Sequence, residues 1–180
     1  MKLLTYKTQE SEARLGFIHN NKIVDMEDFG ETVNFPLPST MLELIDMGIE
    51  VVPEINDFLE NLDQESLDEI SYSLEETIIL APIPKPRKNI IGIGLNYTEH
   101  VAESARNLDT TGKLPQKPII FSKPPTAVIG TNENILLNKK LTQQLDWEVE
   151  LAVIIGKKGK FVAKENAMDY VFGYTIINDI

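Results

Sequence analysis

The sequence contains no cysteine. This absence excludes a disulfide framework, a thiolate nucleophile and a zinc–thiolate site. The sequence also lacks any apolar run approaching the roughly 18–20 residues that cross a bilayer, and its first residues include no apolar stretch long enough for a secretory signal. We therefore expect a cytoplasmic protein that has no membrane partner.

Basic residues are in short supply. The 180 residues include 17 Lys and Arg but 28 Asp and Glu, which gives a formal net charge of −11. A nucleic-acid-binding protein needs a basic surface to neutralise phosphates, so we expect no nucleic-acid partner. Apolar residues make up 42% of the chain and charged residues 25%, as in globular proteins, so disorder and coiled coil are poor interpretations.

Charge and proline divide the chain into two parts. Residues 1–80 hold 18 acidic and 4 basic residues, whereas residues 81–180 hold 10 acidic and 13 basic residues. Between them, the proline-rich stretch Ala81–Lys88 cannot continue a helix or a central strand, because proline fixes φ and lacks an amide donor. We predict a small acidic domain at 1–81 and a second domain at 82–180. A proline-rich loop within one domain is the alternative.

The acidic part has the pattern of a hairpin followed by helices. The segments Arg14–His19 and Lys22–Met26 flank Asn20 and Asn21, which tolerate the positive φ of a tight turn. This pattern predicts two antiparallel strands. His19, beside the turn, is interpreted as a solvated residue, and the part as a whole as an accessory domain.

Two short helices follow the predicted hairpin. Thr40 and Glu43 have the spacing of a capping box, and Gly48 is a suitable stop. Pro53 suits the first turn of a second helix.

Strands dominate the second part. Gly92 and Gly94 suggest a dinucleotide-binding loop, but Tyr97 stands where the third glycine should be. We instead interpret these glycines as positions of close backbone approach in a strand. A short helix is predicted near Lys164–Met168, and strands are predicted at Asn89–Leu95, Pro118–Phe121, Ala127–Gly130, Ile135–Leu137, Trp147–Gly156 and Tyr170–Asn178.

The strongest chemical signal is a pair of glutamates in a predicted strand. Side chains at positions i and i+2 of a strand leave from the same face, so Glu148 and Glu150 project together while Trp147, Val149 and Leu151 pack on the opposite side. Neighbouring carboxylates repel, and a divalent cation relieves the repulsion. Oxygen ligands without sulfur favour Mg²⁺ or Mn²⁺, with Ca²⁺ as an alternative. A strand whose polar face is simply hydrated fits the spacing as well.

Two further elements carry groups suited to chemistry. An apolar strand ends with Asp179, which can supply a third carboxylate but also fits a routine turn. If Thr98 caps a helix, His100 and Glu103 lie on one face at i, i+3 spacing. An imidazole beside a carboxylate suits a general base, although this spacing by itself is more typical of a surface His–Glu pair.

Four motifs follow one another in the sequence. They are Ile93–Tyr97 followed by His100, Phe121–Pro124, Asp146–Lys157 and Gly173–Asp179. Taken together and in this order, they resemble the fumarylacetoacetate hydrolase family, whose members include acylpyruvate hydrolases, oxaloacetate decarboxylases and hydroxyheptadienedioate isomerases. The resemblance covers roughly residues 82–180, and the acidic first part is similar to the small leading domain of bacterial members.

The resemblance implies a metal site and a catalytic group. Glu148 and Glu150 match the family's paired metal-binding glutamates, and Asp179 matches the aspartate that completes its carboxylate triad. His100 matches the catalytic histidine, and Glu103 matches its acidic partner on a mobile lid. In the Phe-x-Lys-Pro motif, Lys123 matches a lysine near the substrate.

The resemblance also sets expectations for fold, assembly and activity. We expect an α+β protein in which the small N-terminal domain precedes a β-rich roll that continues beyond Ile180, and we expect a homodimer. The implied activity is metal-dependent cleavage of a C–C bond in small anionic 2-oxo or 2,4-dioxo acids through a metal-stabilised enolate, by hydrolysis or decarboxylation. A catalytically silent binding module, and an isomerase or hydratase on the same metal site, are the alternatives.

Overall fold

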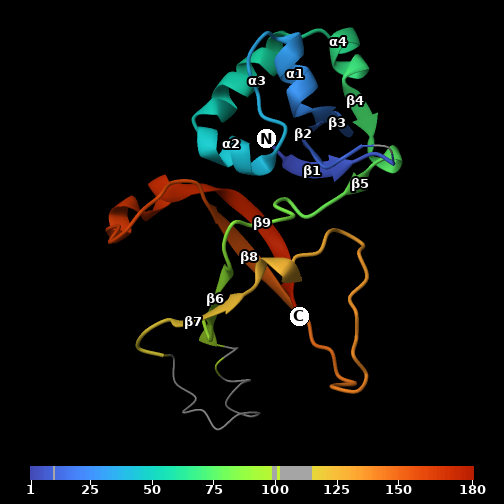
Figure 1. Ribbon diagram of the computed structural model, residues 1–180. Helices are drawn as coiled ribbons and strands as arrows, with labels where there is room; N and C mark the ends of the chain where they lie inside the picture. The colour runs from blue at the N-terminus through green and yellow to red at the C-terminus, as the bar shows by residue number, and fades with distance from the viewer. Residues whose placement is uncertain (10, 99–100, 102–114) are drawn as a thin grey trace. The chain divides into compact units, whose positions relative to one another are not determined.

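The protein combines helices and antiparallel strands, which confirms the predicted α+β class. The computed structural model describes all residues except 10, 99–100 and 102–114 (Figure 1). Among the described residues, no helix has both the length and the apolar character that crossing a membrane requires.

The chain separates into two compact units. The first unit consists of residues 1–84 and 129–180, and the second of residues 85–128. The division after Pro84 lies inside the proline-rich stretch. A domain boundary at residue 81 stays a prediction.

A five-stranded antiparallel sheet organises residues 1–84, which we call the N-terminal lobe. Its strand order is β4-β3-β2-β1-β5. The central hairpin was expected, and its turn has the backbone required: φ is 45° at Asn20 and 63° at Asn21. The strands are β1 (Leu3–Lys7), β2 (Arg14–His19), β3 (Lys22–Asp25), β4 (Ser71–Ser73) and β5 (Ile78–Ile79).

Four helices belong to the N-terminal lobe, and two of them were predicted. α2 begins after Thr40, whose hydroxyl accepts a hydrogen bond from the Glu43 amide at 3.3 Å, and it ends at Gly48. α3 carries Pro53 in its first turn. The helices are α1 (Met26–Thr32), α2 (Met41–Met47), α3 (Val51–Asn61) and α4 (Gln64–Glu69), and a 3₁₀ turn follows at Leu74–Glu76.

The main core of the lobe lies between the helices and one face of the sheet (Figure 1). Phe17 of β2 and Phe29 of α1 meet edge to face, with ring centroids 5.4 Å apart. Such aromatic pairs add to the free energy gained from burial alone. The other fully or nearly fully buried members from the lobe are Leu15, Val24, Met26, Met41, Leu44, Ile45, Val51, Ile55 and Leu67.

A buried carboxylate ties the sheet to α1. Asp25 is fully buried and caps α1 by accepting hydrogen bonds from the amides of Glu27 and Asp28, both at 3.0 Å. It also accepts hydrogen bonds from Tyr6 Oη at 2.6 Å and from Arg14 Nε and Nη2 at 2.6 and 2.7 Å. Burial by itself raises the pKa of Asp25, but these donors outweigh it and lower the pKa.

This network predicts that acid weakens the N-terminal lobe. A lowered pKa means that folded Asp25 stays ionised where the unfolded chain takes up a proton, so its contribution to stability is present above about pH 4 and is lost as the pH falls further. Burial and Asp25 raise the pKa of Asp28, which offsets part of this loss. We expect urea midpoints to fall between pH 5 and pH 3, and to fall less in Asp25→Asn. If the urea midpoint falls by the same amount between pH 5 and pH 3 in the unchanged protein and in Asp25→Asn, Asp25 is not the source of the acid sensitivity.

The second unit contains an antiparallel strand pair. β6 (Ile90–Gly94) pairs with β7 (Ile119–Lys123), and a 3₁₀ turn follows at Pro125–Ala127. Gly92 lies opposite Phe121, and a Cβ at this position would overlap the Phe121 ring. Gly92 therefore serves close packing in a strand, as the sequence predicted.

Two predicted strands are wrong. Ala127 ends the 3₁₀ turn, where its amide donates to the Pro124 carbonyl at 3.0 Å, and residues 128–130 are not in a strand. Residues 135–137 have no regular structure, and Leu136 is 92% exposed. No described strand pairs with this short apolar run, so propensity alone does not make it a strand.

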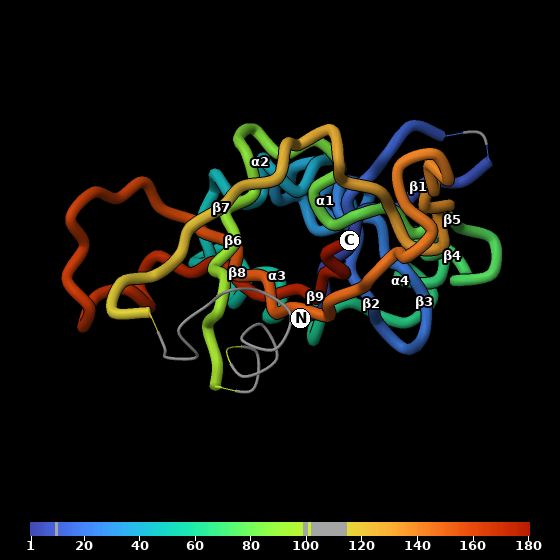
Figure 2. The backbone as a smooth tube through the Cα atoms, turned by 90° about the horizontal axis from the view of Figure 1, so that it is seen from below, coloured from blue at the N-terminus to red at the C-terminus, as the bar shows by residue number. Residues whose placement is uncertain are grey.

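The last strands of the chain form a hairpin, which we call the C-terminal hairpin. β8 (Glu148–Ile155) pairs antiparallel with β9 (Val171–Asp179), and both views show the two strands side by side (Figures 1 and 2). A 3₁₀ helix at Lys164–Tyr170 lies where a short helix was predicted.

Candidate metal centre

Three carboxylates meet at one end of the C-terminal hairpin. Glu148 of β8 lies directly opposite Asp179 of β9 in the register, and Glu150 lies two residues further along β8. One ligand oxygen from each side chain lies within 4.8 Å of the others. Glu148 is exposed, whereas Glu150 and Asp179 are partly buried.

The meeting follows from strand geometry. Directly opposite residues of an antiparallel pair share a face, and so do residues two apart on one strand. Glu148 therefore shares its face with Asp179, which is paired with it, and with Glu150, which is two residues away on the same strand. The sequence predicts that Glu148 and Glu150 share a face. That Asp179 joins them depends on the cross-strand register, which no local motif contains.

The donor set fits a hard divalent cation. All three groups supply oxygen, and the spread of their ligand atoms is small enough for one ion to contact all of them. Three neighbouring carboxylates repel one another when ionised, and a dication compensates that repulsion.

The opposite face of the hairpin corrects one expectation. Val149 and Leu151 do lie on the side away from the carboxylates, but they do not pack there, since they are 81% and 68% exposed. Trp147, just before β8, is 72% exposed as well. Within the described part of the chain, no element covers this face.

Of the three residues matched to catalytic roles, the structure describes only Lys123. His100 and Glu103 lie outside the described residues. Thr98 and Val101 are helical, and the Val101 amide donates to the Tyr97 carbonyl at 3.2 Å, as expected for the predicted helix entry. Lys123 ends β7 in the second unit.

A cavity of about 390 Å³ borders the carboxylate-bearing face of the hairpin within the first unit. Thr175, which pairs with Ala152, and Ile154 share that face and line the cavity together with Ile45 and Ile83 of the N-terminal lobe. The cavity is therefore mainly apolar, and it begins at Thr175, whose partner Ala152 lies two residues along β8 from Glu150.

One residue of structural importance at the hairpin was not anticipated. Phe172 of β9 is 8% exposed and joins the core of the N-terminal lobe. A bulky apolar residue next to Gly173 is common in a strand, so the sequence around Phe172 does not indicate that its side chain packs in the core of the N-terminal lobe. Only the cross-strand register shows that Phe172 is displaced from the regular pairing.

Comparisons with known proteins agree with the motifs. A family model described as fumarylacetoacetate (FAA) hydrolase, C-terminal, matches residues 89–180. Oxaloacetate tautomerase YisK of Bacillus subtilis is 40% identical over 91% of this chain and 54% of its own length. The mitochondrial oxaloacetate tautomerase fahd2 of Xenopus laevis is 33% identical over 100% of this chain and 52% of its own.

Solved structures share the fold. A fumarylacetoacetate hydrolase from Exiguobacterium antarcticum matches with a TM-score of 0.69 at 30% identity, over 99% of this chain and 55% of that one. Maleylpyruvate hydrolase from Sphingobium sp. SYK-6, solved with manganese(II) and pyruvate, matches with a TM-score of 0.70 at 26% identity, over 99% and 58%. The chain thus spans about half the length of these relatives. The family model covers half of the sequence, and the chain belongs to the fumarylacetoacetate hydrolase family, which includes the enzymes named above.

Proposed function

We propose that the protein binds Mg²⁺ or Mn²⁺ through Glu148, Glu150 and Asp179 and acts on small anionic 2-oxo acids. The observation that carries this proposal is the convergence of three carboxylates within 4.8 Å. Two comparisons support it: the structurally similar maleylpyruvate hydrolase was solved with manganese(II) and pyruvate, and two relatives are named oxaloacetate tautomerase.

Our first candidate reaction is cleavage of a C–C bond in a 2-oxo or 2,4-dioxo acid. Glu148, Glu150 and Asp179 would hold the cation. The cation would supply a Lewis acid for the negative charge that develops on the 2-oxo oxygen.

The residues matched to catalytic roles have separate tasks in this proposal. In hydrolysis, His100 accepts a proton from the water that attacks the distant carbonyl, and Glu103 orients the His100 ring. Decarboxylation needs no attacking water. Lys123 attracts the anionic substrate.

The second candidate is keto–enol tautomerisation at the same carboxylates. The name of the relative that is 40% identical, oxaloacetate tautomerase, favours it. Tautomerisation removes a proton from C3, returns one to the 2-oxo oxygen and releases no fragment, whereas cleavage breaks the C3–C4 bond and then takes up a proton at C3. Both candidates therefore pass through an enolate at C2–C3, and they differ in their products.

Deuterium incorporation at C3 tests for the enolate that the candidates share. In D₂O, we expect the Mg²⁺-loaded protein to accelerate this incorporation, followed by ¹H NMR, relative to the protein treated with EDTA. Tautomerisation places deuterium in oxaloacetate itself, whereas cleavage releases CO₂ or an acyl fragment and places deuterium in the pyruvate that remains. If a folded, metal-loaded protein accelerates neither deuterium incorporation nor fragment release from oxaloacetate and acylpyruvates, the silent-module alternative replaces this proposal.

A further inference from the structure

The alignment of the three carboxylates depends on the register of the C-terminal hairpin. Glu148 faces Asp179 only while these residues are paired. A slip of one residue would place Asn178 opposite Glu148 and turn Asp179 to the other face, because strand side chains alternate. What fixes the register therefore also fixes the triad.

The usual determinants of register are weak in this hairpin. Tight turns of two to five residues fix the register in short hairpins, but β8 and β9 are joined by the long connection 156–170. A buried face also fixes register, but neither face of this hairpin is fully buried along its length. Leu151 and Ile176, which pair on the uncovered face, are 68% and 72% exposed, and the carboxylate-bearing face is only partly buried. A two-stranded hairpin is itself only marginally stable.

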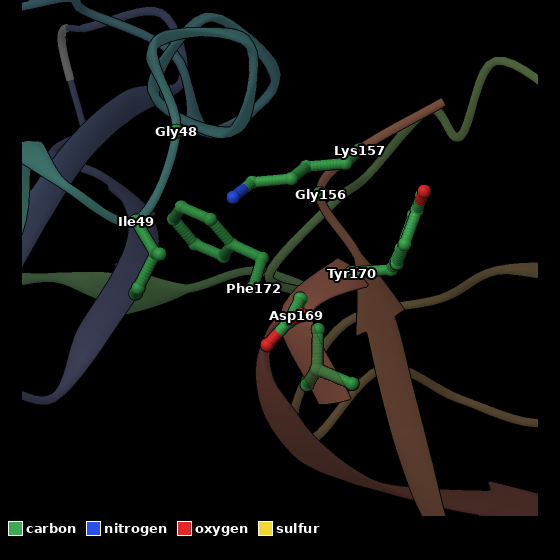
Figure 3. Close-up of a pocket in the computed structure, with 8 residues that line it drawn as sticks. Gly48, Ile49, Gly156, Lys157, Asp169, Tyr170 and Phe172 are labelled. Atoms are coloured by element: carbon green, nitrogen blue, oxygen red, sulfur yellow. The ribbon is translucent and has the colours of Figure 1, made fainter. Parts of the chain in front are cut away.

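A β-bulge at the opposite end of the hairpin supplies an anchor. The register passes from the pair Ile154–Gly173 to the pair Ile155–Val171, so Phe172 is the extra residue. Bulges change the direction of side chains. Simple alternation along β9 would place Phe172 on the uncovered face, but at the bulge its side chain instead packs in the core that α2 and α3 help to form. Its ring points toward Ile49, in the connection between α2 and α3, and away from Tyr170 (Figure 3).

Neighbouring contacts hold this anchor in one place. Ile154 packs against the same core from β8. A Cβ at Gly156 would lie 2.9 Å from the Phe172 Cβ, so the backbones approach closely there, and the Gly156 amide donates to the Tyr170 carbonyl at 2.8 Å. Lys157 Nζ and Glu50 Oε1 form an ion pair at 2.8 Å beside them, although an exposed pair of this kind adds little stability.

We propose that Phe172 is a positioning residue: by docking in the core of the N-terminal lobe it locks the register of β8 and β9 and keeps Asp179 on the face of Glu148 and Glu150. This inference rests on the proposed function for its consequence, metal binding, but the register lock can be measured by itself. It gives the N-terminal lobe a task, which is to hold the metal-binding hairpin in register.

A disulfide trap measures the register. The sequence has no cysteine, so Leu151→Cys with Ile176→Cys creates a single pair at directly opposite positions, within reach of a disulfide. After a slip of one residue, the two thiols would lie on opposite faces. We expect nearly complete closure in the otherwise unchanged chain and a clear loss in the Phe172→Ala background. Leu67→Ala, which opens the lobe core at α4, is the matched control and should close fully.

Manganese affinity measured on the same backgrounds without the added cysteines completes the test. We expect Phe172→Ala to weaken Mn²⁺ binding by at least about tenfold, as when a supporting group of a metal site is removed, Phe172→Leu to restore most of it, and Leu67→Ala to leave it unchanged. If Phe172→Ala does not fold, Ile154→Ala removes the contact that β8 makes with the same core, and we expect it to lower disulfide closure and Mn²⁺ affinity in the same way. Closure and affinity equal to those of Leu67→Ala would overturn the proposal. Absence of Mn²⁺ binding in the unchanged protein would instead contradict the proposed function, and the disulfide trap would still decide the register.

Discussion

Replacing any one of the three clustered carboxylates by its amide, as in Glu148→Gln, Glu150→Gln or Asp179→Asn, should abolish Mn²⁺ binding at micromolar concentrations. Each change keeps the shape of the side chain but removes the charge of one ligand from a set that lies within 4.8 Å. Isothermal titration calorimetry measures the loss. Catalysed deuterium incorporation at C3, into oxaloacetate or into the pyruvate released from it, should fall with it by about 10³-fold or more, since several kcal/mol of charge stabilisation would be lost.

Val149→Ala is the matched control for these variants. Val149 lies between the two glutamates in sequence, but its side chain is on the opposite face and is 81% exposed. We expect its Mn²⁺ affinity to equal that of the unchanged protein. Full affinity in all three amide variants would refute the metal site, and loss in Val149→Ala as well would show that the assay reports folding of the hairpin.

Asp25→Ala should be among the most destabilising substitutions in the N-terminal lobe. It removes the partner of the buried Tyr6 hydroxyl, two hydrogen bonds of Arg14 and the cap of α1, while Arg14 Nη2 keeps its hydrogen bond to Asp28 Oδ1 at 2.8 Å. Leaving the Tyr6 hydroxyl without a partner costs about 1–3 kcal/mol of the free energy of unfolding, and loss of the helix cap costs about 1 kcal/mol more. Urea unfolding followed by circular dichroism measures this cost.

Asp63→Ala measures the cost of losing a helix cap alone, which separates that contribution from the contacts of Asp25 with Arg14 and Tyr6. Asp63 also caps a helix, by accepting from the Ser66 amide at 2.9 Å, but it is solvent-exposed at the start of α4. Loss of this cap should cost about 1 kcal/mol. Costs for Asp25→Ala and Asp63→Ala that agree within error would show that the contacts with Arg14 and Tyr6 contribute little.

Local patterns predicted the elements that local chemistry determines. The Asn20–Asn21 turn, the Thr40 cap and the Gly92 position were all predicted, because each depends on residues close in sequence or on a property of one residue. Motif order also identified the family, which the family model confirms. The strand β1 (Leu3–Lys7) was missed, because its short mixed pattern becomes a strand only by pairing with β2 and β5.

Features that join distant segments could not be predicted in this way. The hydrogen bond from Tyr6 to Asp25 depends on β1, which lies on the other side of β2 from β3. Phe172 acquires its role from a bulge and from a core built more than a hundred residues earlier. The strand at 135–137 was expected from apolar content alone, and no partner strand is present among the described residues.

The candidate site shows the same division. The shared face of Glu148 and Glu150 follows from alternation along one strand, whereas the position of Asp179 depends on the register across two strands. The resemblance to the family supplied the third residue before geometry did. The roles of His100, Glu103 and Lys123 stay predictions from that resemblance.

The most direct test is diffraction at the manganese absorption edge from crystals grown with Mn²⁺. We predict one strong anomalous peak for each chain at the end of the C-terminal hairpin, about 2.0–2.6 Å from carboxylate oxygens of Glu148, Glu150 and Asp179. A peak bound by other residues, or none at saturating Mn²⁺ with these three side chains ordered, would contradict the metal centre and the 2-oxo acid chemistry that depends on it.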